Sequence, residues 1–416
     1  MLCTMTPRPL SAFVAGLSLA AVTNCATQDV GSCIPGTPDC VCTAATTCDA
    51  GLRCVDNRCI EPEDSGTLGG GGSEGTDPTL LPPSQTATET QTETDPTGAD
   101  ESSSSGAPAG PCEGTVLRMV SYNIQAVGTE GSAQWQGLGS VLRRLGPDVA
   151  CLEEIEDEDV APLQALTDAL GWGEPVFANT SPGIGGELRN ACIGPLPITR
   201  FSSYGSELSE DPDANDVGRD FLGVRVEKDG CAVGILAIHA KSGQETIDLF
   251  RRQVEFIRLG QAIADARAQR FADALVVMGD FNEDIADPVI GTSLTQIPQA
   301  LPPSYELGAD IQLPMTYDPF AVLDDAGLTR LDPTHEDSDE TTTWGVTDGF
   351  DGVRLDYVFY EGVQPEAQLV YDSCRDDGID DPPAGAWLPL ADEPLGCGVS
   401  AQASDHLPIV VELRVE

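Results

Sequence analysis

Apolar runs of strand length alternate with helical patterns from Cys112 to the end of the chain, and no other feature of the sequence constrains the fold as strongly. The runs that predict strands are TVLRMVSYNI (115–124), DVACLEEI (148–155), ALVVMGD (274–280), RLDYVFY (354–360), AQLVYD (367–372) and LPIVVELRV (407–415). Amphipathic patterns predict helices at 135–145, 159–170 and 246–270, and residues 221–240 predict a hairpin. Because hairpins occur among crossover helices, we expect a layered α/β sandwich rather than a purely parallel sheet.

Residues 1–24 have the pattern of an export signal. Arg8 precedes an apolar run from Leu10 to Val22 that is too short to span a bilayer. The following Ala21-Val-Thr-Asn-Cys25 resembles a bacterial lipoprotein cleavage box, in which the cysteine becomes the lipidated first residue. Two outcomes remain open, a lipid anchor at Cys25 or free secretion. Both predict a bacterial protein that is secreted or held on the outer surface as a lipoprotein.

The 14 cysteines are unevenly placed and favour an oxidising compartment. Six of them crowd residues 25–60, which predicts a small disulfide-rich module; they are Cys33, Cys40, Cys42, Cys48, Cys54 and Cys59. Residues 61–111 are rich in Gly, Ser, Thr and Pro and lack large apolar side chains, so we expect a disordered linker. The remaining domain, 112–416, is large enough for a full core.

Inside 112–416, the sequence suggests where disulfides form. Cys374 and Cys397 bracket a loop rich in Pro, Asp and Gly and are the first pair we expect. Cys192 with Cys231 is a second pairing, and Cys151, within an apolar strand, reads as a buried free thiol.

The charge of the chain limits its partners. The net charge is -47, and residues 112–416 hold 18 basic against 54 acidic residues, a net charge of -36. Such a surface opposes nonspecific binding to duplex nucleic acid or anionic lipid, which depends on basic contacts to phosphates. Divalent cations could bridge the repulsion, or arginines could gather into a local basic patch; the candidates are Arg143, Arg144, Arg251, Arg252 and Arg354.

Polar residues interrupt or adjoin the ends of the apolar strands, where sheet proteins commonly build sites. They are Asn123, Glu153, Glu154, His239, Asp280, Asn282, Asp356, Asp405 and His406. A single Asn or Asp in such a place is usually a turn former, and a single His is usually a satisfied, partly buried residue. The set as a whole favours a site, because two of the three histidines, His239 and His406, adjoin acid-rich strand ends.

Six blocks of sequence carry a family resemblance: SYNIQ (121–125), PDVACLEEI (147–155), LAIHAKSG (236–243), VVMGDFNED (276–284), RLDYVFY (354–360) and SDHLPIVVEL (404–413). In this order they resemble the endonuclease/exonuclease/phosphatase superfamily, the deoxyribonuclease I fold, over nearly all of 112–416. The resemblance implies a four-layer sandwich of two mixed β-sheets flanked by helices. It also implies hydrolysis of phosphoester bonds with Mg²⁺ or Mn²⁺.

The resemblance assigns metal-site positions to Asn123 and Glu154, with Asp405 as an acidic neighbour. Glu153 stands where relatives usually carry Gln, so Glu154 is the expected carboxylate ligand. The oxygen ligands that hard divalent cations prefer are consistent with this set.

The remaining implied roles concern phosphate and water. His239 contacts the scissile phosphate or serves the leaving group, and Asp280 with Asn282 orients the attacking water and holds a phosphate oxygen. Asp356 and His406 act as a couple that takes the proton of water, because an unperturbed imidazole titrates near neutral pH. Arg189 falls where relatives place a phosphate-contacting side chain.

Three further polar residues read as ordinary surface residues. Glu283 and Asp284 are expected at an exposed helix start, and His335 in a solvated loop.

The function expected is an exported, divalent-metal-dependent phosphodiesterase, first of all a nuclease that degrades extracellular DNA or RNA. A phospholipid or small phosphate-ester hydrolase on the same site is the alternative; apolar residues in 301–320 either touch a membrane or pack in the core. A tethered binding module without activity is the non-enzymatic alternative. The expected partners are a phosphoester substrate, with nucleic acid first, and no obligate protein partner.

Overall fold

The computed structural model describes residues 112, 114–180, 184, 188–269, 272–336, 339–345, 352–378 and 390–416, and the backbone of 53–55 and 58–60. The chain divides into two compact units, residues 1–73 and 74–416. In the first unit, strands β1 (Arg53–Val55) and β2 (Arg58–Ile60) pair antiparallel, with Cys54 opposite Cys59. The predicted export signal, the lipid anchor, the other module cysteines and the 61–111 linker lie outside the described residues.

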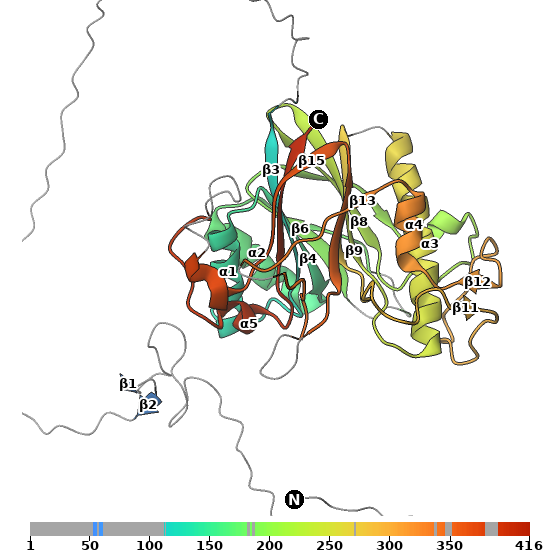
Figure 1. The fold of residues 1–416 in the computed structure, drawn as a ribbon, viewed down its shortest axis with the longest axis horizontal. Coiled ribbons are helices and arrows are strands. Elements are labelled where there is room, and N and C mark those ends of the chain that lie inside the picture. Colours follow the sequence, from blue (N-terminus) through green and yellow to red (C-terminus); the bar gives the residue numbers. More distant parts are fainter. Residues whose placement is uncertain are drawn as a thin grey trace, which may run out of the picture. The chain divides into compact units, whose positions relative to one another are not determined.

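Two six-stranded sheets form the second unit (Figure 1). The first sheet has the order β15 (Val363–Val370), β16 (Ile409–Val415), β3 (Val116–Asn123), β4 (Val149–Ile155), β6 (Arg189–Ile193) and β5 (Val176–Phe177). The second has the order β13 (Thr329–Arg330), β14 (Asp356–Glu361), β10 (Ala274–Asp280), β9 (Cys231–His239), β8 (Phe221–Lys228) and β7 (Ile198–Tyr204). Both sheets are mixed, because the β3–β4 and β9–β10 pairs are parallel and the other pairs are antiparallel.

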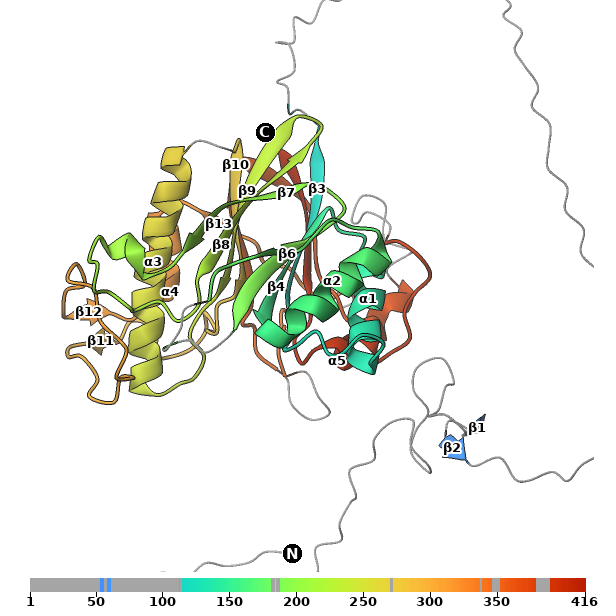
Figure 2. The same cartoon turned by 180° about the vertical axis from the view of Figure 1, so that it is seen from behind.

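Helices cover the outer face of each sheet (Figure 2). Helices α1 (Ala133–Leu145), α2 (Val160–Leu170) and α5 (Val399–Ala403) pack on the first sheet, and α3 (Thr246–Gln269) and α4 (Pro319–Asp325) pack on the second. Short 3₁₀ helices also occur in the connections: η1 (Asp157–Asp159), η2 (Ser206–Ser209) and η3 (Ser373–Gly378). The predicted sandwich of two mixed sheets flanked by helices is therefore confirmed.

Strand alternation explains the layers. In β9, Val233 and Ile235 lie in the core between the two sheets, whereas Leu236 and Ile238 lie in the core under α3. Successive side chains of a strand point to opposite faces, so a strand buried on both faces is apolar throughout. All nine residues of β9 are buried, in agreement with this rule.

Residues 291–331 contain several short elements of regular structure between β10 and β14. They contain α4 and the small sheet of β11 (Ser293–Leu294) and β12 (Met315–Thr316). Tyr305 and Tyr317 are buried in an apolar cluster with residues of α3. The apolar side chains of 301–320 thus pack mainly in the core.

Three disulfides cross-link the described part of the second unit. Cys374–Cys397 confirms the first expected pair. The other two are Cys112–Cys231 and Cys151–Cys192, so the predicted Cys192–Cys231 pair and the predicted free thiol of Cys151 are wrong. Cys151 and Cys192 lie directly opposite each other in the antiparallel β4–β6 pair, a neighbour relation that spacing in sequence cannot reveal.

Replacing both Cys151 and Cys192 with alanine is expected to lower the free energy of unfolding by about 3–4 kcal/mol, because the 41-residue separation no longer restricts the unfolded chain. Urea unfolding of the variant and the wild type measures the difference. A loss below about 1 kcal/mol would contradict the expected contribution of this cross-link.

His335 is not in a solvated loop, and that prediction is wrong. Its side chain is almost fully buried. Ring Nε2 lies 2.9 Å from the carbonyl oxygen of Thr342, and Nδ1 has no hydrogen-bond partner among the described residues. Burial lowers the pKa of His335 below its usual value, although the bond to Thr342 acts in the opposite direction. The folded protein therefore holds this ring neutral.

Replacing His335 with glutamine is expected to reduce acid sensitivity. Because the pKa of His335 is lower in the folded state, the unfolded state binds more protons, and stability falls as pH drops below about 6.5. The loss is at most about 1.4 kcal/mol per pH unit for this group. Urea unfolding at pH 7.5, 6.0 and 5.0 should show the stability difference between wild type and variant narrowing as pH falls. A constant difference would contradict the prediction.

Candidate active site

The site lies where the core between the two sheets ends. In β10, Val276 and Met278 face the opposite sheet, and Asp280 takes the next inward position. In the same way, the last inward-facing residue is His239 in β9 and Asn123 in β3. One end of the apolar core is therefore lined by polar side chains.

Strand register brings three of these side chains into one row of the second sheet. Asp280 is paired with His239 of β9 on one side and with Asp356 of β14 on the other. From the first sheet, the Asn123 carboxamide donates to Asp280 Oδ2 at 2.9 Å. All four side chains are buried. The structure thus joins segments that lie far apart in sequence.

Glu154 enters the same cluster through an irregularity in β4. Its φ of 64° is in the left-handed region, and the β4–β6 register shifts between Leu152 and Ile155. A bulge of this kind redirects a side chain that regular alternation would turn away. Asn123 Nδ2 donates to Glu154 Oε1 at 3.0 Å, while Asn123 Oδ1 accepts from the backbone N–H of Gln125. Asn123 therefore orients the carboxylates of both Glu154 and Asp280 through its amide NH₂.

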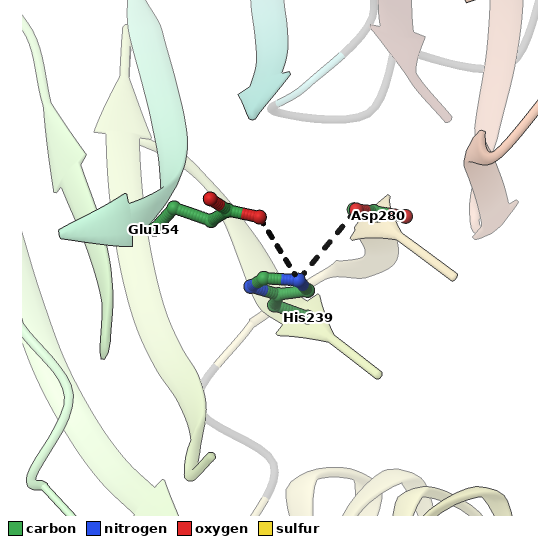
Figure 3. Close-up of side chains that lie close together, drawn as sticks. All are labelled: Glu154, His239 and Asp280. Carbon is green, nitrogen blue, oxygen red and sulfur yellow. Dashed lines mark ion pairs between the residues drawn. The ribbon is translucent and has the colours of Figure 1, made fainter. Parts of the chain in front are cut away.

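His239 sits between the two carboxylates (Figure 3). Its Nε2 is 3.6 Å from Glu154 Oε1 and 3.6 Å from Asp280 Oδ2. Neither ring nitrogen has a hydrogen-bond partner within the part of the chain that the structure describes. Burial, followed by the charges of Arg219 and other neighbours, holds the pKa of His239 well below its usual value. The ring is therefore neutral, with a nitrogen able to accept.

The donor set fits a divalent cation. Among the described residues, Glu154, His239 and Asp280 form a group of possible metal ligands. One carboxylate oxygen or ring nitrogen from each residue lies within 4.8 Å of the others. Carboxylate oxygens are preferred by Mg²⁺ and Mn²⁺, and Mn²⁺ also accepts imidazole. The unpartnered nitrogens of His239 and the partly exposed carboxylate of Glu154 leave ligand atoms available. The identity of the ion stays a prediction.

Asp280 and Asn282 form one rigid turn after β10. Asn282 has a φ of 53° and donates from its backbone N–H to Asp280 Oδ1 at 2.7 Å. Its carboxamide donates to Asp280 Oδ2 at 3.1 Å and to the carbonyl of Ala240 at 2.9 Å. Phe281, between them, is fully buried and anchors the turn in the core under α3. Burial raises the pKa of Asp280, against the opposing charge of His406.

His406 and Asp356 are in hydrogen-bonding contact, and their predicted role in taking the proton of water stays a prediction. His406 Nδ1 is 2.9 Å from Asp356 Oδ2, and Nε2 is 3.9 Å from Asp280 Oδ2. Burial alone would lower the pKa of His406, but the charge and hydrogen bond of Asp356 prevail and raise it to about 9. The hydroxyl of Ser404 accepts from the His406 backbone N–H and donates to the Asn123 carbonyl, which fixes the backbone of His406.

Two predicted site residues, Asp405 and Arg189, are not members of the group formed by Glu154, His239 and Asp280. Asp405 is exposed, and its Oδ2 accepts from the Trp344 indole at 3.2 Å. Arg189 pairs with Asp157, and its guanidinium lies over the ring of Phe177. The structure therefore does not bring Asp405 or Arg189 into the carboxylate group; their predicted roles as a metal neighbour and a phosphate contact stay predictions.

Two residues at the site received no role from the sequence. Glu153 is fully buried, neither carboxylate oxygen has a hydrogen-bond partner in the described chain, and burial together with Asp356 raises its pKa. Its signals in the sequence were two consecutive acids after an apolar strand and a position where relatives usually carry Gln. Arg219, before β8, lies close enough for its charge to act on Glu154 and His239. Nothing in the sequence distinguishes it from other arginines.

Glu283 is buried, contrary to its predicted exposure, and no helix begins there. It accepts hydrogen bonds from Arg252 and from the hydroxyl of Tyr317. Arg252 also donates to two backbone carbonyls of the loop after His239. This buried network ties α3 to the loops that follow β9 and β10. Glu283 therefore helps to fix the positions of these two loops.

Comparisons with known proteins identify one family and several similar solved structures. The model of the endonuclease/exonuclease/phosphatase family matches residues 120–406. No curated protein matches the chain. An endonuclease/exonuclease/phosphatase structure from Beutenbergia cavernae is 17% identical and covers 72% of each chain with a TM-score of 0.47. Truncated TDP2 from Caenorhabditis elegans is 15% identical, covers 74% of this chain and 100% of its own, and has a TM-score of 0.43.

A family protein from Bacteroides thetaiotaomicron is 15% identical and covers 73% of this chain and 98% of its own, with a TM-score of 0.44. The family match spans more than half of the chain and includes the described site residues from Asn123 to His406. This chain belongs to the endonuclease/exonuclease/phosphatase family, a family of phosphoester hydrolases.

Proposed function

We propose that this protein is an exported, divalent-metal-dependent phosphodiesterase that cleaves nucleic acid outside the cell. The observation that carries the proposal is the convergence of Glu154, His239 and Asp280 beside the His406–Asp356 couple. Phosphoester hydrolysis needs a positioned water, a proton held near the leaving oxygen and positive charge for the phosphate oxygens. The site contains groups for each requirement.

The side chains have distinct proposed tasks. Asp280, held by the N–H groups of Asn282 and Asn123, orients the attacking water. His406 holds a proton at Nε2 beside the phosphate, and Asp356 fixes the ring through Nδ1. Glu154 and Asp280 would hold a Mg²⁺ or Mn²⁺ ion, which when bound would act as a Lewis acid toward the phosphate.

An aromatic ring beside His406 supports nucleic acid as the substrate. Trp344 is 36% exposed, and its ring centroid is 6.4 Å from that of His406. An exposed indole next to the reacting phosphate can stack on a nucleobase, a contact worth about 1–3 kcal/mol per base. The apolar residues of 301–320 lie mainly in the core. They therefore no longer favour a lipid substrate.

Charge favours a single strand over a duplex. Arg144, Arg252 and Arg354 are buried in separate ion pairs, with Asp376, Glu283 and Asp332 respectively. They do not gather into the basic patch that the sequence left open. With a net charge of -36 over 112–416, stacking and a divalent cation must replace the basic contacts that duplex binding uses.

Three disulfides in the described residues support the export part of the proposal, because such cross-links persist in oxidising compartments. Secretion or a lipid anchor at Cys25 is tested by fractionating cells and treating them with a lipoprotein signal-peptidase inhibitor. Protein found only in the cytosol would remove this part of the proposal.

A substrate panel tests the activity. The full chain is incubated with single-stranded DNA, plasmid DNA, RNA, sphingomyelin vesicles and inositol phosphates, with Mg²⁺ or Mn²⁺ and with a chelator. We expect metal-dependent cleavage of nucleic acid, fastest for single strands, and slower by about 10²-fold or more in the His406→Ala variant. Hydrolysis of only sphingomyelin or the inositol phosphates would show that the substrate is a lipid or a small phosphate ester and not nucleic acid. Metal binding without any hydrolysis would mark an inactive binding module.

A further inference from the structure

Glu153 lies on the inner face of the first sheet, at the same level as the candidate active site. In β4, Val149 and Cys151 face the core between the sheets, and Glu153 takes the next inward position. In β6, Cys192 faces the same core, and Asn190 is the next inward residue. Glu153 and Asn190 therefore lie next to each other, one inward step beyond the disulfide that joins the two strands.

Across the core, Glu153 faces His239. Glu153 is paired with Asn123 in the first sheet, and His239 is paired with Asp280 in the second. Because Asn123 donates to Asp280 across the gap between the sheets, the two neighbouring residues also face each other. The packing of β4 against β9 agrees with this placement.

Asn190 faces the same part of β9. Its Nδ2 donates to the carbonyl oxygen of Ala237 at 3.1 Å and to that of Asp220 at 3.0 Å. Ala237 is the inward residue that precedes His239 in β9. Since both amide hydrogens of Asn190 are used, its Oδ1 is the atom that is left to accept a further hydrogen bond.

The three side chains are buried and hold polar atoms without a partner. Glu153 and Asn190 are 0% exposed and His239 is 2% exposed. Within the described ranges, no hydrogen-bond partner reaches either oxygen of Glu153, Oδ1 of Asn190 or either ring nitrogen of His239. Buried polar atoms in folded proteins nearly always have a partner, because an unpaired one costs about 1–3 kcal/mol. Several such atoms in one place indicate a shared partner.

An ordered water is the partner that suits these atoms. Nε2 of His239 lies 3.6 Å from the carboxylates of Glu154 and Asp280 and faces the candidate cation site, which leaves Nδ1 for the water. A buried water makes about three hydrogen bonds, and it can both donate and accept. A divalent cation suits the space less well, because Glu153 does not belong to the group of possible metal ligands.

We propose that one buried water joins Glu153, Asn190 and Nδ1 of His239, and that Glu153 is thereby a positioning residue for His239. This inference rests on the proposed function, because it states how the ring beside the phosphate is held. The contacts of Nε2 at 3.6 Å are longer than hydrogen bonds, so they do not fix the ring. A partner on the second ring nitrogen sets the orientation of a site histidine.

Magnetic relaxation dispersion of the solvent tests for the water, because it counts the waters that stay inside the full chain. Glu153→Met retains the length of the side chain but removes both oxygens, and it is expected to lose one long-lived water. Glu153→Gln retains an acceptor oxygen and should retain the water. Glu158→Met, the same change at an exposed position of η1, is the matched control and should leave the count unchanged. An unchanged count in folded Glu153→Met would overturn the inference.

Kinetics tests the positioning role. On a substrate that the wild type cleaves, Glu153→Met should lower kcat about 10–100-fold and leave KM within about twofold, because the ring acts in the transition state. Glu153→Gln should stay within about threefold of the wild-type kcat, since it preserves the contact to the water. Equal losses in the two variants would contradict positioning through the water.

A crystal structure of the full wild-type chain decides the matter if Glu153→Met does not fold. A water within about 3.2 Å of a Glu153 oxygen, of Asn190 Oδ1 and of His239 Nδ1 is expected. A metal ion in that place, or direct contact among the three side chains, would overturn the inference.

These readouts separate the inference from the proposed function. The water count and the crystal structure require no turnover, so they decide the inference even if the wild type hydrolyses no phosphoester. Loss of the water with an undiminished kcat would reject Glu153 as a positioning residue and leave the proposed function standing.

Discussion

Replacing Glu154 with glutamine is expected to lower phosphoester hydrolysis by about 10³-fold, because an amide cannot supply the charge that a divalent cation requires. Glu154 is the partly exposed carboxylate of the group with His239 and Asp280, so it is the member most open to a bound ion. The change retains the shape of the side chain, and Asn123 keeps a neighbour of the same size. Rates with Mg²⁺ and Mn²⁺, and Mn²⁺ affinity by calorimetry, measure the effect.

The control for this variant is Glu158→Gln, the same chemical change at an exposed position of η1. It should alter neither Mn²⁺ affinity nor rate by more than about twofold. If Glu154→Gln retained both the affinity and the rate of wild type, the cation would have to be held by other groups, and the site as described would be wrong.

Replacing His406 with alanine is expected to lower the rate by about 10²–10⁴-fold, the usual contribution of a positioned acid–base group. Asp356→Asn should approach this loss, since it removes the charge that stabilises and orients the ring across the 2.9 Å contact. If the two residues act as one unit, the double variant will be no slower than His406→Ala alone. Asp325→Asn, an exposed position at the end of α4, is the matched control.

The same pair has a spectroscopic signature that does not depend on substrate. The chain has three histidines, so their ring signals can be assigned by NMR from single replacements. In the metal-free protein, the pKa of His406 is expected at about 9, and in Asp356→Asn it should fall, because burial then opposes the proton with less compensation. An unchanged titration of His406 in Asp356→Asn would show that Asp356 does not control this ring.

Much of the fold follows from local pattern. The residues ALVVMGD match β10 (Ala274–Asp280), and the hairpin of β8 and β9 turns where the sequence places Lys228-Asp229-Gly230. Such agreement is expected, because alternation and turn chemistry act over a few residues. The same alternation also predicts that the polar residues at the strand ends point toward the space between the sheets.

The contacts that a residue makes were harder to predict than the helix or strand in which it lies. The sequence expected Cys151 to be free, Glu283 to be exposed and His335 to be solvated, and the structure buries all three. The partners of Cys151 and Glu283 lie 41 and 31 residues away in the chain, whereas the contact of His335 is with Thr342, only seven residues ahead. The spacing of residues along the sequence does not show which strand lies alongside β4, or which helix covers the loop after β10.

By itself, the sequence determined which residues face inward on each strand and that the last inward position is polar, because the two-residue period of a strand is a local property. Only the tertiary structure decided that His239, Asp280 and Asp356 share one row, and that a bulge turns Glu154 into the same space. Those outcomes depend on strand order and register, which arise from packing of the whole core and not from neighbouring residues.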